Sequence, residues 1–165
     1  MTDQDKLIKT DRMRYTKNKL SSNLAILAIL FDVFYFVNIY KSDVSSYYYN
    51  ILVGGSVVYN LIFMLAVFLA SEGVKTYNKK YSYLLLIVGI LQFVRIFIIP
   101  AKAHAAVVTI AKQERIVMDT AQFVRCVLYL CVSGICCLTS AIVGLIRSNR
   151  LEAYLSTLGE EVRRD

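Results

Sequence analysis

The stretch that decides the fold is "LLLIVGILQFVRIFIIP", residues 84–100, in which a glutamine and an arginine interrupt an otherwise apolar run. A run of this length approaches the roughly 20 residues that a helix needs to cross a bilayer. The letters "QFVR" recur at residues 122–125, inside another long apolar run, "TAQFVRCVLYLCVSGICCLTSAIVGLI", residues 120–146. Both runs predict membrane-spanning helices, and each carries an arginine one helical turn from a glutamine.

The composition of the whole chain agrees with this prediction. Of its 165 residues, 57% are hydrophobic and 19% are charged, whereas water-soluble domains have roughly 45–50% and roughly 25%. Backbone groups in hydrocarbon need internal hydrogen-bond partners, so the spans should be helices, and no alternation typical of a membrane β-barrel is present. We predict an all-α integral membrane four-helix bundle, with spans near residues 22–40, 51–70, 83–99 and 120–146.

The distribution of lysine and arginine predicts the orientation of these spans. Basic residues precede the first span in a segment comprising residues 1–21, lie between the second and third spans, and follow the fourth. Lys and Arg concentrate on the cytoplasmic side of membrane proteins, so we expect both termini in the cytoplasm. No small-x-small cleavage pattern follows the first apolar block, so we expect it to be retained.

The net charge of +7 predicts contact with anionic lipid headgroups rather than with nucleic acid, for which no motif is present. We expect a multi-pass protein of the cell membrane, either a plasma membrane or a bacterial inner membrane. No cofactor or metal is predicted, because the four cysteines lie in the fourth span without metal-site spacing and histidine occurs once. No motif of a known class of enzyme is present either.

The two intramembrane arginines predict a polar cluster. The third span runs outward and the fourth runs back, so Arg95 and Arg125 should reach a similar depth. Asp32, in the first span, is the intramembrane acid that could pair with either of them, because an unpaired charge in a span is costly. One carboxylate cannot neutralise two guanidinium groups, so a remaining arginine would snorkel to the surface or hold an anionic headgroup, an anionic substrate or an acid of another subunit. Amide side chains at suitable depth complete the predicted cluster: Gln92, Gln122, Asn60 and Asn38.

Three further segments carry structural predictions. Small residues at steps of four in the fourth span, among them Ser140 and Gly144, predict close helix packing. Pro100 should end the third span, and residues 103–119 have helical composition, either extending the fourth span or lying on the surface. Residues 147–165 predict an amphipathic cytoplasmic helix that docks onto a partner or onto the basic inner loop around Lys79, through an apolar face that comprises Leu151, Tyr154, Leu155, Leu158 and Val162.

The leading functional interpretation is a non-catalytic accessory, scaffold or regulatory subunit of a larger membrane assembly, bound to another membrane protein or to itself. The alternative is a small oligomeric transporter or channel, in which Arg95, Arg125 and Asp32 line a route for an anion or a proton. A membrane-bound enzyme or a lipid-handling protein is the third. Charged residues that face a hydrated cavity would favour transport, and dry, paired ones would favour the subunit.

Overall fold

The computed structural model describes residues 3–39, 47–105, 107–110, 113–116 and 118–164. Predicted features at other positions lie outside the described residues. The elements follow one another along the chain as α1 (Asp3–Met13), α2 (Lys19–Ile39), α3 (Tyr47–Lys75), α4 (Lys79–Ile98), α5 (Pro100–Ala105), β1 (Val107–Ile110), β2 (Gln113–Ile116) and α6 (Thr120–Arg164).

Four of the helices are long and apolar enough to cross a membrane, as predicted: α2, α3, α4 and α6. The shortest of them, α4, has 20 residues and is therefore about 30 Å long, which equals the thickness of the hydrocarbon core of a bilayer. Their outward faces are apolar. Leu65 and Phe97 are 70% and 75% exposed, respectively, which suits contact with lipid better than contact with water.

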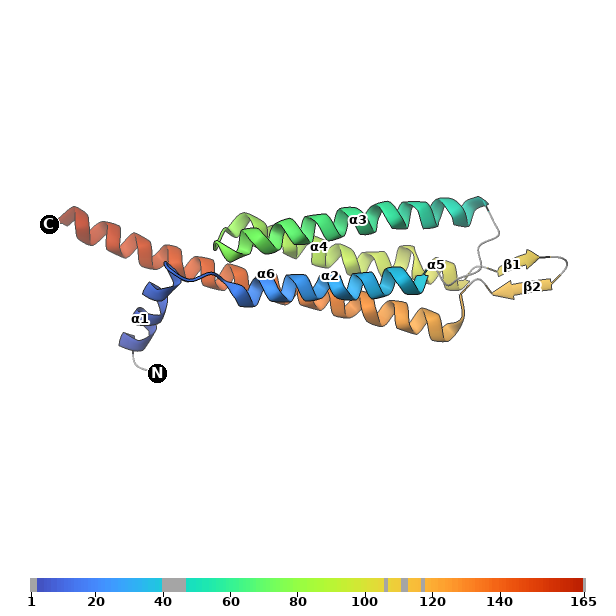
Figure 1. Ribbon diagram of the computed structural model, residues 1–165, viewed down its shortest axis with the longest axis horizontal. Coiled ribbons are helices and arrows are strands. Elements are labelled where there is room, and N and C mark those ends of the chain that lie inside the picture. The colour runs from blue at the N-terminus through green and yellow to red at the C-terminus, as the bar shows by residue number, and fades with distance from the viewer. Residues whose placement is uncertain (1–2, 40–46, 106, 111–112, 117, 165) are drawn as a thin grey trace.

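The four long helices run side by side in alternating directions and form an elongated bundle (Figure 1). Helix α6 packs most extensively against α2 and α4, and α3 packs against the same two helices from the other side. Helices α2 and α4 are therefore diagonal neighbours. We call the end at which both chain termini lie the terminal end, and the end that carries the two strands the hairpin end (Figure 1).

Local sequence explains where α4 begins and ends. Asn78 caps its first turn, because the Asn78 side chain accepts a hydrogen bond from the backbone N–H of Lys80 at 3.1 Å. The preceding Tyr77 has a φ of 57° and makes the tight turn from α3. Helix α4 ends at Ile98, and Pro100 begins the short helix α5, because proline cannot donate a backbone hydrogen bond to the preceding turn.

The segment between α5 and α6 corrects a prediction. Residues 103–119 were expected to be helical, but residues 107–116 hold two antiparallel strands, with Val107 opposite Ile116 and Ile110 opposite Gln113. The run Val107–Ile110 is "VVTI", and all four of its residues are β-branched and favour strands over helices. Apart from this hairpin, the regular structure of the described chain is helical.

Helix α6 has 45 residues and continues from the bundle into the C-terminal segment without a break. The predicted fourth span and the predicted C-terminal helix are therefore one element. Its C-terminal part projects beyond the bundle at the terminal end, where α1 also lies (Figure 1).

Small residues allow the helices to approach closely. Ser21 of α2 and Ser140 of α6 each donate a side-chain hydrogen bond to the other's backbone carbonyl, at 2.7 and 2.6 Å. At Gly144, an added Cβ would lie 2.4 Å from the Ser82 Oγ of α4. The predicted small-residue stripe of α6 therefore faces both α2 and α4.

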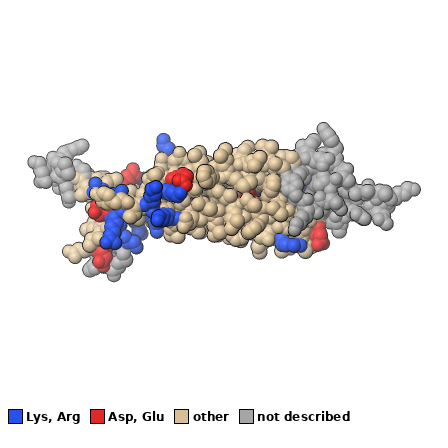
Figure 2. Space-filling model, in the orientation of Figure 1, with Lys and Arg blue, Asp and Glu red and all other residues tan. Residues whose placement is uncertain are grey.

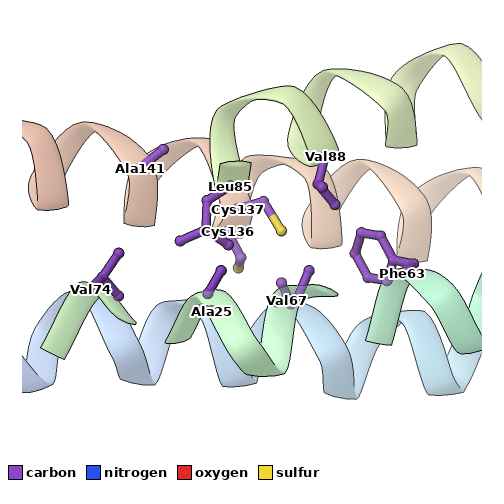
Figure 3. Packing of buried hydrophobic residues seen from close by; sticks show 11 residues of the cluster. Ala25, Phe63, Val67, Val74, Leu85, Val88, Cys136, Cys137 and Ala141 are labelled. Carbon is purple, nitrogen blue, oxygen red and sulfur yellow. The ribbon is translucent and has the colours of Figure 1, made fainter. Parts of the chain in front are cut away.

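Two apolar clusters fill the interior of the bundle. The larger one lies towards the terminal end and contains Leu85, Val67 and the thiols of Cys136 and Cys137 (Figure 3). The smaller one includes Tyr35 and Leu130. The polar residues described below lie between these two clusters along α2, because Ala28 belongs to the first and Tyr35 to the second.

Candidate functional site

The interior of the bundle contains an ion pair. The Arg95 Nη1 of α4 donates a hydrogen bond to the Asp32 Oδ1 of α2 at 3.2 Å, and the exposed fractions of the two side chains are 3% and 0%. The pair connects the two helices that face each other diagonally across the bundle. Each charge compensates the other. Either charge left alone in the interior would be strongly destabilising.

Further polar side chains extend the pair to all four long helices. Gln92 of α4 donates to the same Asp32 Oδ1 at 3.0 Å and to the Ser133 Oγ of α6 at 3.3 Å. The Nη2 of Arg95 donates to the Ser56 Oγ of α3 at 3.1 Å. We call these five residues, Asp32, Ser56, Gln92, Arg95 and Ser133, the buried polar cluster.

Ser133 also anchors the cluster to the backbone. Its hydroxyl donates a hydrogen bond to the carbonyl of Ala28 on α2 at 2.9 Å. Ser133 accepts from Gln92 as well, so its hydroxyl acts as donor and acceptor at once. The backbone of α2 is thereby joined to α4 through a residue of α6.

Two aromatic rings enclose the guanidinium group. The Cζ of Arg95 lies 4.3 Å from the ring centre of Tyr35 and 4.6 Å from that of Tyr59. Each contact is a cation–π interaction, worth roughly 0.5–2 kcal/mol. The arginine charge is therefore neutralised by the Asp32 carboxylate and stabilised by both rings.

Several buried polar atoms around the cluster have no hydrogen-bond partner among the described residues. They are the Asp32 Oδ2, the Gln92 Oε1, the Arg95 Nε, the Tyr35 hydroxyl and both amide atoms of Asn60. Asn60 lies one helical turn along α3 from Ser56 and is fully buried. Asn60 was predicted to belong to the polar cluster; its side chain is buried beside the cluster, but its amide does not hydrogen-bond to it.

The structure does not bring Arg125 and Gln122 into the cluster. Arg125 is exposed, and its Nε donates to the carbonyl of Ala121 in its own helix at 3.1 Å. Gln122 donates to the carbonyl of Asn38 at 2.6 Å and ties α6 to the last turn of α2. The predicted cluster of both arginines is therefore wrong in its membership, and the interior does not hold a second, uncompensated guanidinium group from Arg125.

The position of Arg125 favours snorkelling. It lies five residues after Thr120, the first residue of α6, or about 7.5 Å along the axis from the hairpin end of that helix. Side chains of a helix point back towards its N-terminus, and the bond to Ala121 directs Arg125 the same way. In a bilayer, its charge would reach the headgroup region.

The C-terminal part of α6 contacts the chain's own terminal end. The Tyr154 hydroxyl donates to the Asp11 Oδ1 of α1 at 3.2 Å, and Arg147 donates to the Asn18 Oδ1 at 2.8 Å. Glu152 forms an ion pair with Lys79 at the start of α4. This ion pair joins the segment to Lys79 of the chain's own basic loop, through Glu152 and not through a residue of the predicted apolar face.

The predicted docking residues divide into two groups. Leu151, Tyr154 and Leu158 are partly buried, whereas Leu155 is 44% exposed. The side chain of Val162, which completes the predicted apolar face, lies outside the described residues. Leu155 is the member of this face that stays most available to another molecule.

Within the described part of the chain, no three His, Cys, Asp or Glu side chains converge on a point where a metal ion could bind. The four cysteines are free thiols. Cys126, Cys136 and Cys137 are buried, where a thiol packs as a small apolar side chain.

Four residues of the site were absent from the predicted cluster: Ser56, Tyr59, Ser133 and Tyr35. A signal for the first two exists in the sequence, because Ser56, Tyr59 and Asn60 are spaced so that they share one face of α3.

No protein-family model, curated protein or solved structure matches the chain. The function is therefore inferred from this geometry alone.

Proposed function

We propose that the chain is a non-catalytic, multi-pass membrane protein that serves as an accessory or scaffold subunit of a larger membrane assembly. The observation that carries this proposal is the Asp32–Arg95 pair, which is buried and bonded within the chain. A route for ions needs charged groups that face water. Here the charged groups join the four helices to one another.

The surfaces left for recognition lie outside the bundle. The outward faces of the long helices are apolar and suit lipid or another membrane helix. The projecting part of α6 adds Leu155, and α1 adds Leu7 and Ile8, which are 56% and 59% exposed. These surfaces support contact with a protein partner at the terminal end.

The charge of the terminal end supports a cytoplasmic location for both termini. Figure 2 shows Lys and Arg side chains gathered towards that end, whereas the middle of the visible face is almost entirely uncharged. Basic residues of cytoplasmic segments lie beside anionic headgroups. We therefore place the terminal end in the cytoplasm and the hairpin end outside the cell or in the periplasm.

The orientation can be tested by cysteine labelling. In a variant without the native cysteines, single cysteines at position 78, just before α4, and at position 102, in α5, would report on the two ends of the bundle. We expect an impermeant thiol reagent, applied from outside, to label position 102 and not position 78. Labelling of position 78 alone would reverse the proposed orientation.

The role as a subunit can be tested by purification from native membranes in a mild detergent, followed by mass measurement of the complex. We expect a species heavier than the single chain. A chain truncated after Arg150 should keep its bundle but lose cytoplasmic partners, because it lacks Leu155 and its neighbours.

The matched control for the truncation is the full chain with Leu65→Ala, which alters an exposed residue of α3 far from the terminal end. Two results together would favour transport over the role as a subunit. The purified protein would migrate as a single chain, and it would drive ion flux in proteoliposomes that Asp32→Asn abolishes.

A further inference from the structure

A lateral pocket lies between α3 and α4, beside the buried polar cluster. Its volume is about 360 Å³, which lies at the lower end of the range of small-molecule pockets. Its lining includes Gly55, Ser56 and Tyr59 of α3 and Leu91, Val94 and Arg95 of α4. Most of the lining is apolar, and the lining residues that carry polar groups are Ser56, Tyr59 and Arg95.

The pocket opens on the outward face of the bundle. Leu91 and Val94, which line it, are 44% and 46% exposed. At Gly55, no heavy atom lies within 4 Å of the position that a Cβ would take. A ligand would therefore enter sideways, from the hydrocarbon that surrounds the spans in the membrane setting proposed above.

Arg95 lines this pocket, and its side chain is 3% exposed. Its Nη1 is bonded to Asp32 and its Nη2 to Ser56. Its Nε is buried and has no acceptor among the described residues. A buried donor without an acceptor is costly, so a ligand that brings one acceptor to Nε would gain more than it would in water.

The charge at the site selects the kind of acceptor. Asp32 already neutralises Arg95, so a second carboxylate would add a buried negative charge beside Asp32. An uncharged carbonyl would accept a hydrogen bond from Nε without that repulsion. The pocket therefore fits an apolar body with an ester carbonyl better than it fits a fatty acid.

The depth of Arg95 agrees with such a ligand. Arg95 lies in the last turn of α4, three residues before Ile98, where the helix ends. That separation is about 4.5 Å along the helix axis. In the orientation proposed above, Arg95 lies in the outer half of the span, on the side of the outer leaflet, whose glycerol esters lie below its headgroups.

We propose that the pocket between α3 and α4 binds one acyl chain of an outer-leaflet phospholipid, whose ester carbonyl accepts a hydrogen bond from the Arg95 Nε. The proposal rests on the insertion of the spans in a bilayer in the orientation proposed above, and not on the role as a subunit. It adds a lipid site to a protein whose buried charges are otherwise bonded internally.

The test compares lipid retention by the full chain and by two glycine variants. Gly55→Leu places a side chain in the pocket without a clash, because the space beyond Gly55 is open. Gly54→Leu is the matched control, since the space at Gly54 is equally open and the residue does not line the pocket. Both variants should fold, which circular dichroism and thermal unfolding would verify.

Native mass spectrometry in detergent would measure binding of a diester phosphatidylcholine and of its diether analogue, which lacks the carbonyl. We expect one diester lipid per chain in the wild type and in Gly54→Leu. Binding should be at least about tenfold weaker in Gly55→Leu and about tenfold weaker for the diether lipid, because one hydrogen bond to a charged group is lost.

Three results would overturn the proposal: a wild type that retains no lipid, equal retention by the two glycine variants, or stronger binding of oleic acid than of the diester. None of these results depends on whether the chain co-purifies with a protein partner. The lipid site and the role as a subunit can therefore fail independently.

Discussion

Asp32→Asn should destabilise the bundle because it leaves the buried charge of Arg95 without its counter-ion. The substitution keeps the size of the side chain but removes the negative charge that lies 3.2 Å from the Arg95 Nη1. Removal of one partner of a buried pair typically costs about 3–5 kcal/mol. Tyr35, Tyr59 and Ser56 still stabilise the guanidinium group, so we expect the lower end, about 3 kcal/mol.

A double-mutant cycle separates the effect of the stranded charge from that of altered packing. Arg95→Met removes the guanidinium group and keeps an unbranched side chain. The double variant Asp32→Asn/Arg95→Met should be more stable than Asp32→Asn alone, because no unpaired charge remains in the interior. The matched control is Arg125→Met, which removes an exposed arginine and should change stability by no more than about 0.5 kcal/mol.

The measurement is reversible unfolding of the purified full chain in mixed micelles, followed by far-ultraviolet circular dichroism as the fraction of denaturing detergent rises. Equal stability of Asp32→Asn and the wild type would refute the reasoning. Strict additivity of the two single substitutions would refute it as well, since it would mean that the two side chains do not interact.

Two further predictions concern packing and surface charge. Gly144→Leu should lower the stability of the bundle by about 1–3 kcal/mol, because the new side chain would collide with Ser82. Gly54→Leu should leave the stability unchanged, because the space at Gly54 is open, and thermal unfolding of both variants would test this difference. Lys79→Glu should cost less than about 1 kcal/mol, because the side chains of Lys79 and Glu152 are 35% and 67% exposed. The reversed pair Lys79→Glu/Glu152→Lys should recover that loss at low salt, and a loss that persists would show that the ion pair is not its source.

The sequence predicts the four long helices well, because the apolar runs are long and the charges lie between them. It also predicts that Asp32 lies near the depth of an arginine, since the helical rise converts residue number into distance. The small residues of α6 lie where the predicted stripe places them, against α2 and α4. These predictions depend on length and spacing alone, which one sequence supplies in full.

The hairpin could not be predicted in the same way. A strand of four residues, such as Val107–Ile110, is too short for hydrophobic periodicity to distinguish it from a helical turn. Neither glycine nor proline occurs between residues 107 and 116 to indicate a turn. The β-branched run was the one feature that indicated a strand. The absence of helix breakers between residues 107 and 116 favoured the incorrect prediction of a helix.

The two copies of "QFVR" differ for a reason that residue counting does not reveal. Each residue of a helix is rotated by about 100° from the one before it, so the direction of an arginine depends on its phase relative to the buried face. In α4, Leu85 and Gln92 are buried and Arg95 continues their face. In α6, the buried face passes through Cys126, so Arg125 is rotated by about 100° from it and points outward. The same four letters therefore place Arg95 among its partners and leave Arg125 free to reach the surface. The interior then holds one of the two arginines, and the single carboxylate of Asp32 neutralises it.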